Sequence, residues 1–427
     1  MEYKPKVLVT APVGTRSGYG SRSRDLIRAL IKRDKYQITI NPVPWGNTPQ
    51  NALDTNNPKD QEIINRIAQP TEQPDVHIHC VVPNEFTPAG KFNIGVTAGL
   101  ETTLVPMDWI EGCNRMDLVL CSSKFAKESI AGTRYKNEAG QELKVTTPID
   151  IIFEGADLEI YKKTNEFSPD VISTMDQVKE DWNFLFVGHW LQGGLGRDRK
   201  DVGGLIKTFY DSFSHDSGVG LILKTAGATP SIMDAEDIQR KINDIKAIVT
   251  NSGDKKLPNV YLLHGDLTDN EMNQLYNHPK IKANISFTHG EGFGRPLLEA
   301  SLSEKPILAP KWSGHVDFLG GKRQKWLPGG LIKVEPGSFP DNMYVEGQQW
   351  FGVNYGAAAE MMKSLRINYR KHLAWSKKLA ANNRKNYSFD AMSIKIEQIL
   401  NGVLPKFTQT VDVNLPKLNL PKLEKVG

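Results

Sequence analysis

Short apolar runs alternate with stretches of helical spacing along most of the chain. In the first part, the runs that indicate strands are 6–11, 36–43, 76–82, 92–97, 118–121 and 149–153. Between the first two, residues 21–31 place Leu26, Ile27 and Leu30 on one face of a helix. Short buried strands that alternate with helices are typical of a parallel, doubly wound sheet.

The same alternation restarts after a polar segment, 166–182, which we expect to be a linker. The strands predicted beyond it are 183–187, 219–223, 259–263, 283–287 and 307–309. The helices predicted between them are 202–213, 235–249, 269–276 and 296–302. The pattern therefore predicts an α/β protein with two Rossmann-like doubly wound domains, 1–165 and 183–385. Ligands of such domains lie beyond the carboxyl ends of the strands, so we expect a cleft between the two.

The last hundred residues follow a different pattern. Residues 320–352 are rich in glycine, proline and aromatic residues, among them Trp326, Phe339, Tyr344, Trp350 and Phe351, and predict an ordered surface insertion. Helical spacing returns over 354–385 and 388–400. The tail, 405–427, repeats an Asn-Leu-Pro-Lys-Leu unit whose prolines prevent a regular helix, so it is expected to be an extended strap or a flexible tail.

Composition narrows the class of protein. With 427 residues the chain is long enough for two full cores. It has no apolar run near the ~20 residues of a membrane span. The first residues lead straight into a strand, so we expect no signal peptide. Cys80, Cys113 and Cys121 are odd in number and lack CxxC spacing, which favours reduced cysteines in a cytoplasmic protein.

The net charge of +4 is unevenly distributed. Residues 1–40 hold nine Lys and Arg against three acidic residues. Such an excess is typical of a solvated helix face, and it also suits an anionic partner.

The segment 286–300 carries the strongest chemical signal. Glu291 and Glu299 stand eight positions apart, with a Gly292-Phe293-Gly294 turn between them and a predicted strand before them. Arg295-Pro296 suits the first turn of a helix. The amides of a helix N-terminus favour a phosphate, and a carboxylate one turn inside the helix can accept hydrogen bonds from a diol. This combination suits a sugar nucleotide.

Glu291-x7-Glu299, with Gly-Phe-Gly inside it and Glu-Ala at its end, resembles the signature of the retaining family 4 glycosyltransferases of the GT-B fold. Residues 303–310 match the next turn and strand of that family. The resemblance implies that Glu291 contacts the donor sugar and Glu299 the ribose. Donor contact is also implied for the Gly292-Phe293-Gly294 turn. His289, at a strand end beside the signature, either contacts the donor sugar or is a structural histidine. A C-terminal helix, 386–404, would cross back to the first domain.

The implied reaction is transfer of a hexose or pentose, with retention, from a nucleotide-diphosphate sugar to a hydroxyl group by a front-face mechanism. The donor would be a UDP- or GDP-sugar, and no bound cofactor is expected. The departing diphosphate must be neutralised. The sequence has no Asp-x-Asp triplet, which favours basic side chains over a metal.

Basic side chains that would neutralise the diphosphate follow Gly188, where a predicted strand ends. Lys200 matches the family's lysine, whereas His189 stands where the family has an arginine. Arg197 and Arg199 either compensate for that departure or are surface charges. His264 closes another strand, where members of the family seat the nucleotide base with backbone groups.

The first domain offers an acceptor-side loop after its first strand. Arg16 precedes Gly18-Tyr19-Gly20, whose amides would lie over the phosphates or the acceptor. Glu101 follows another strand, so that it either lines the cleft or caps a helix.

Three alternatives remain. The segment 314–319, with the aromatic segment after it, resembles glycosyltransferases of large tailed phages. In that case the acceptor is a hydroxymethylated DNA base in the host cytoplasm, rather than a glycan or a lipid-linked glycan, and the basic first helix would follow the phosphates. The histidine at position 189, where the family has an arginine, also suits a non-catalytic sugar-nucleotide-binding or scaffold protein. An NAD-binding enzyme is disfavoured because the first turn lacks GxGxxG spacing.

Overall fold

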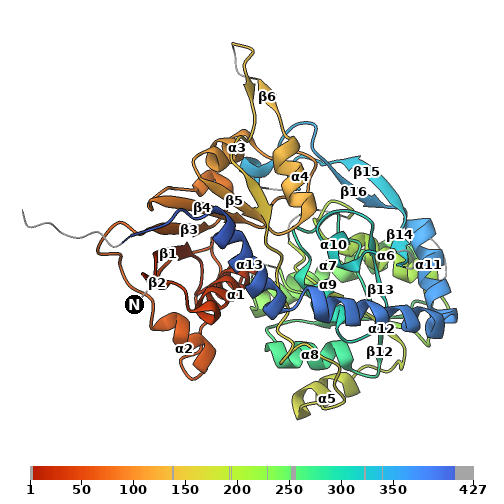
Figure 1. Ribbon diagram of the computed structural model, residues 1–427. Coiled ribbons are helices and arrows are strands. Elements are labelled where there is room, and N and C mark those ends of the chain that lie inside the picture. The colour runs from red at the N-terminus through yellow and green to blue at the C-terminus, as the bar shows by residue number, and fades with distance from the viewer. Residues whose placement is uncertain are drawn as a thin grey trace, which may run out of the picture.

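The structure is a computed structural model, described for residues 3–136, 139–191, 193, 195–227, 229–251, 256–321, 324–338 and 340–408. Two α/β units lie side by side, each built on a six-stranded parallel sheet with helices against it (Figure 1). The prediction of two doubly wound domains is confirmed.

The first sheet has the strand order β2-β1-β3-β4-β5-β8. In that order its strands are Gln37–Pro42, Lys6–Ala11, Val76–Cys80, Phe92–Thr97, Leu118–Cys121 and Ile149–Ile151. The helices of this part are α1 (Gly18–Arg33), α2 (Pro58–Ile64), α3 (Met107–Asn114) and α4 (Lys124–Gly132), with a 3-10 turn at Pro83–Glu85. A small hairpin, β6 (Tyr135–Lys136) and β7 (Glu142–Leu143), projects from the body (Figure 1).

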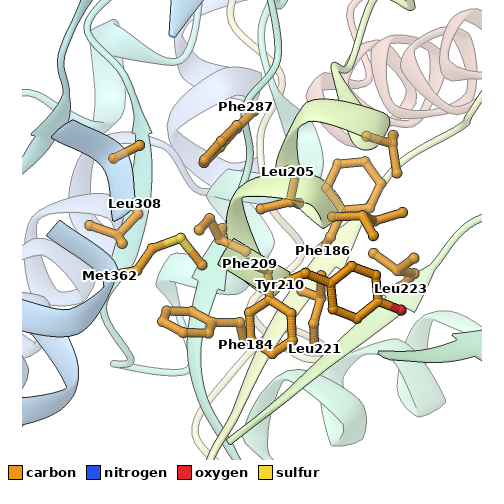
Figure 2. Packing of buried hydrophobic residues seen from close by; sticks show 14 of the residues in the cluster. Phe184, Phe186, Leu205, Phe209, Tyr210, Leu221, Leu223, Phe287, Leu308 and Met362 are labelled. Atoms are coloured by element: carbon orange, nitrogen blue, oxygen red, sulfur yellow. The ribbon is translucent and has the colours of Figure 1, made fainter. Parts of the chain in front are cut away.

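The second sheet has the order β11-β10-β9-β12-β13-β14. In that order its strands are Asn259–Leu263, Gly220–Lys224, Asn183–Val187, Ile281–Ile285, Ile307–Pro310 and Trp326–Leu327. The helices are α5 (Pro169–Asp176), α6 (Val202–Phe213), α7 (Ile232–Thr250), α8 (Asp269–Asn277), α9 (Arg295–Ser301) and α10 (Val316–Leu319). Aromatic side chains fill one face of this sheet, where Phe184 and Phe186 of β9 meet Phe209 of α6 (Figure 2).

Several predicted boundaries differ from the structure by one to three residues, and the strand that leads to the paired glutamates is one of them. The strand predicted at 283–287 ends at Ile285, so Ser286 and Phe287 already belong to the loop that leads to the paired glutamates. The single helix predicted over 354–385 is two helices, α11 (Tyr355–Ile367) and α12 (Tyr369–Asn386), which meet at Asn368. The break has a packing reason, because α11 contacts α6 while α12 contacts α9.

The last helix, α13 (Phe389–Val403), leaves the second unit and packs against α1 (Figure 1). Met392, Ile396 and Leu400 are buried in the hydrophobic cluster of the first sheet. The tail predicted at 405–427 falls, from residue 409 on, outside the described residues.

The segment 320–352 is more than a surface insertion, which corrects the expectation. It adds β14 to the second sheet and forms the antiparallel hairpin β15 (Gly329–Lys333) and β16 (Gln349–Val353), with a 3-10 turn at Asp341–Met343. Trp350 of β16 packs with Trp109 in a cluster of the first domain. The amide of Thr103 donates to the carbonyl of Gln349 at 2.9 Å. The hairpin therefore joins the two domains; Phe339 lies outside the described residues.

Trp350→Ala should lower the free energy of unfolding by about 3–5 kcal/mol, because it leaves a large cavity in a packed cluster. Trp350 is only 1% exposed, and its ring stacks on His289 with centroids 4.2 Å apart. Urea denaturation measures the change. Ile367→Ala is the control, because Ile367 is 82% exposed and its truncation should change stability by less than ~0.5 kcal/mol. A Trp350→Ala variant as stable as this control would contradict the interdomain role of the hairpin.

Candidate functional site

A largely buried ion pair lies at the carboxyl edge of the second sheet. Lys200 comes from the loop after β9 and Glu291 from the loop after the neighbouring strand β12. Lys200 Nζ lies 2.6 Å from Glu291 Oε1, and it also lies 3.5 Å from Thr288 Oγ1 and from the carbonyl oxygen of Gly290. The topology thus brings together two residues that the sequence separates by about ninety positions.

Glu291 is held as a carboxylate. Desolvation raises its pKa, but the charge and the hydrogen bond of Lys200 outweigh this effect, so that the pKa lies below its ordinary value. The backbone amide of Glu291 donates to Ser313 Oγ at 2.7 Å, and its carbonyl accepts from the amide of Gly314 at 2.9 Å. The side chain is therefore an ionised acceptor on a fixed backbone.

A second ion pair joins Arg199 of the second domain to Glu101 of the first. Arg199 Nη1 lies 2.9 Å from Oε1 of Glu101, which is buried. A Cβ on Gly290 would lie 2.6 Å from Glu101 Cβ, so the two domains touch directly here. Glu101 was expected either to line the cleft or to cap a helix. The next helix along the chain, α3, has Pro106 as its N-cap, so the structure supports a place between the domains.

Two glycines of the predicted turn are needed for close approach and backbone shape. The carbonyl of Gly292 accepts hydrogen bonds from Ser122 Oγ at 2.9 Å and Ser123 Oγ at 2.6 Å, both in the first domain. A Cβ on Gly292 would lie 2.6 Å from the carbonyl oxygen of Ala98. Gly294 has φ +96° as the N-cap of α9, a conformation that glycine adopts without strain.

Phe293 and His289 are both expected to contact the donor, and the structure shows their side chains engaged within the protein. Phe293 is buried, and its ring packs 5.0 Å from that of Phe318. His289 is buried as well, and both of its ring nitrogens contact carbonyl oxygens: Nδ1 that of Phe351 at 2.6 Å and Nε2 that of Gly196 at 3.2 Å. Both side chains belong to the packing that supports the loop.

Glu299 has a partner that the sequence analysis missed. It lies on α9, only 7% exposed, with Oε1 2.8 Å from Arg295 Nε. Arg295 is also ion-paired with Asp25 of α1, across the domains. Desolvation raises the pKa of Glu299 to about 7, although Arg295 opposes this shift. The i, i+4 spacing of Arg295 and Glu299 could have revealed their contact, but no local pattern points to Asp25.

The remaining cations after Gly188 are less enclosed. His189 and Arg197 are exposed. Desolvation, followed by the positive charge of Arg199, lowers the pKa of His189, so this ring adds little charge at neutral pH. Gly188 itself donates its amide to the carbonyl of Lys224 at 3.2 Å.

Lys224, at the end of β10, is a further cation near the predicted base-binding position. Its Nζ donates to the carbonyl of Gly265 at 2.6 Å, and desolvation lowers its pKa. The neighbouring His264 is bound through Nε2 to Asp234 Oδ2 at 2.7 Å. The structure thus places His264 at a strand end, as expected, with its ring engaged by α7.

Most of the expected acceptor-side loop forms the first turn of α1, which begins at Gly18. The amide of Gly20 donates to Ser17 Oγ at 2.9 Å, and a Cβ on Gly20 would lie 2.2 Å from the carbonyl oxygen of Thr15. Tyr19 stacks on Trp45 with centroids 4.0 Å apart. Gly18 has open space around it.

Arg16 lies between the domains, with Nε 2.9 Å from Asn51 Oδ1 and 3.9 Å from Asp266 Oδ2. Each of the nine basic residues among residues 1–40 forms an ion pair or a hydrogen bond within the chain. Their partners are carboxylates, side-chain amides, hydroxyls or backbone carbonyls, and the residues are Lys4, Lys6, Arg16, Arg22, Arg24, Arg28, Lys32, Arg33 and Lys35. Every basic side chain of this segment thus has a partner within the chain.

Neither a metal cluster nor a membrane-spanning helix occurs among the described residues. No group of three or more His, Cys, Asp or Glu side chains in that part of the chain is arranged to hold a metal ion. Among the helices described, none is both long and apolar enough to cross a bilayer.

No protein-family model matches the chain, and no curated protein matches its sequence. Solved structures do match its fold. Anabaena HepE in complex with UDP and glucose is 14% identical, with 93% of this chain and 100% of that chain covered and a TM-score of 0.56. A glycosyltransferase from Rickettsia africae is 13% identical, with 94% and 99% covered and a TM-score of 0.60. Sucrose-phosphate synthase from Thermosynechococcus elongatus is 11% identical, with 93% and 99% covered and a TM-score of 0.58. The fold is GT-B.

Proposed function

We propose that this chain is a glycosyltransferase that moves a hexose or pentose from a nucleotide-diphosphate sugar to a hydroxyl acceptor, with retention and without a metal. The observation that carries the proposal is the largely buried Lys200–Glu291 pair at the carboxyl edge of the second sheet. A fixed cation beside a fixed carboxylate suits a leaving diphosphate next to sugar hydroxyls. The complex of HepE with UDP and glucose supports UDP-glucose as the first donor to test.

Lys200 and Arg199 neutralise the diphosphate as it leaves. The bond between the sugar's anomeric carbon and the β-phosphate oxygen breaks, and the nucleoside diphosphate departs with the electron pair. The acceptor oxygen bonds to the anomeric carbon on the same face and gives its proton to a donor phosphate oxygen. Glu291 accepts hydrogen bonds from hydroxyls of the donor sugar and holds the ring against the diphosphate. Because Lys200 contacts Glu291, the bound donor shares this cation between the carboxylate and its own phosphate.

Glu299 binds the ribose, and its pKa of about 7 gives a testable pH dependence. A carboxylate accepts stronger hydrogen bonds than a neutral carboxyl group. The affinity for UDP should therefore rise as the pH increases through 7 and level off above it. Calorimetric titration between about pH 5.5 and 8.5 measures this profile. Glu299→Gln should remove the step near pH 7, and a step that persists in this variant would assign it to another group.

The proposal is tested by titrating the protein with UDP- and GDP-sugars and measuring nucleoside diphosphate release with and without EDTA. The expected result is donor binding and release that EDTA leaves unchanged. Binding without release, with or without a panel of hydroxyl acceptors, would support a non-catalytic sugar-nucleotide-binding protein. Loss of release with EDTA would contradict the metal-independent mechanism.

A further inference from the structure

A pocket of about 510 Å³ lies between the β15–β16 hairpin and the N-terminus of α11. Its volume falls within the ~300–1,000 Å³ of small-molecule sites. Gly196 and His289 both line it. Gly196 belongs to the loop that carries Lys200, and His289 lies two positions before Glu291. The amide of His289 also donates to the carbonyl of Arg199 at 3.0 Å. The pocket is therefore lined in part by the two loops that carry Lys200 and Glu291.

The residues that line the pocket carry no charged side chain, and their polar side chains already have partners. His289 contacts two carbonyl oxygens, as described above. The hydroxyl of Tyr355 donates to Asp201 Oδ2 at 2.8 Å, and Asn354 Oδ1 accepts from the amide of Ala357 at 3.0 Å. The remaining surface is aliphatic, aromatic and backbone, with Ile332 on the hairpin side. Such walls suit a neutral ligand that has an apolar face.

One glycine of the lining has no structural reason to be a glycine. Gly196 has φ +74°, and a Cβ on Gly329 or Gly352 would lie 2.0 Å or 2.9 Å from its neighbours. Gly330 has no positive φ, and a Cβ on it would have nothing within 4 Å, so a side chain there meets open space. The absence of a side chain at Gly330 keeps the pocket free.

We propose that this pocket binds a neutral sugar ring of the acceptor. A sugar ring presents a face of C–H groups to apolar walls while its hydroxyls reach backbone groups and water. Because the loops that line the pocket also carry Lys200 and Glu291, one hydroxyl of such a ligand would approach the donor. The role as acceptor site rests on the proposed transfer reaction, whereas the binding itself does not.

The test uses saturation-transfer NMR with methyl and n-octyl β-D-glucopyranoside as probes. The variant Gly330→Leu fills the pocket, and Gly402→Leu on α13 is the matched control, because Gly402 also has open space around it. We expect saturation of ring protons by the natural protein and by the control, and at least a roughly tenfold weaker affinity in Gly330→Leu. UDP titration of all three proteins is measured in parallel and should give equal affinities.

No ring-proton saturation by the natural protein would overturn the inference, and so would equal saturation by Gly330→Leu. Saturation confined to the octyl chain would assign the pocket to an alkyl group instead and would overturn it too. The failure of the proposed function has a different signature, because then none of the three proteins binds UDP. Equal UDP affinities also show that Gly330→Leu is folded.

Discussion

Lys200→Met is expected to lower nucleoside diphosphate release from the sugar donor by about 10²–10³-fold, the usual effect of removing one group that stabilises developing charge. Lys200 is the buried cation of the candidate site, and its Nζ lies 2.6 Å from Glu291 Oε1. The measurement is the rate of diphosphate release at saturating donor. At saturation, a loss of ground-state binding alone would leave this rate unchanged.

The controls separate chemistry from folding. Arg197→Met removes an exposed cation three positions away and should leave the rate within about twofold. Lys200→Met leaves Glu291 without its counter-charge, so its thermal unfolding is compared with that of Lys200→Met/Glu291→Gln, which lacks both charges. If Lys200→Met is folded and turns over donor like Arg197→Met, Lys200 has no role in the reaction.

Glu299→Ala is expected to weaken the binding of UDP and of UDP-glucose alike, each by about 10–100-fold, because two ribose hydroxyls lose a charged acceptor. Glu291→Ala provides the contrast. It should weaken UDP-glucose binding and leave UDP binding nearly unchanged, because Glu291 is assigned to the sugar. Calorimetric titration of both variants with both ligands gives the four affinities.

Glu299→Ala also removes the ion pair of Glu299 with Arg295. Glu299→Ala leaves the guanidinium of Arg295 with Asp25 as a partner, so the buried charge stays paired. Transfer at full speed by Glu299→Ala would contradict the assignment of ribose binding. Equal weakening of UDP by Glu291→Ala would show that the two carboxylates do not divide the donor between them.

The sequence predicted the two sheets well, because buried parallel strands and amphipathic helices leave local patterns. The strands at 92–97, 118–121, 183–187 and 259–263 and the helix at 202–213 match the structure in both bounds. The helix over 354–385 was not resolved into two, since both halves have helical spacing and only their different packing partners separate them.

The candidate site was predictable only where one local motif holds its residues. The spacing of Glu291 and Glu299 indicated a strand, a turn and a helix, which the structure confirms. The contacts of Arg199 with Glu101 and of Arg295 with Asp25 join segments that are distant in the sequence, so no local pattern contains them. His289 stands next to the motif, yet the hairpin that engages its ring comes from about sixty residues further along the chain.

The central claim is that one site binds the nucleotide sugar through Lys200, Glu291 and Glu299. A crystal structure of the protein with UDP-glucose tests it most directly. The account predicts diphosphate oxygens within hydrogen-bonding distance of Lys200 Nζ, sugar hydroxyls on Glu291 and ribose hydroxyls on Glu299. A nucleotide bound elsewhere, or bound here with its diphosphate away from Lys200, would contradict it.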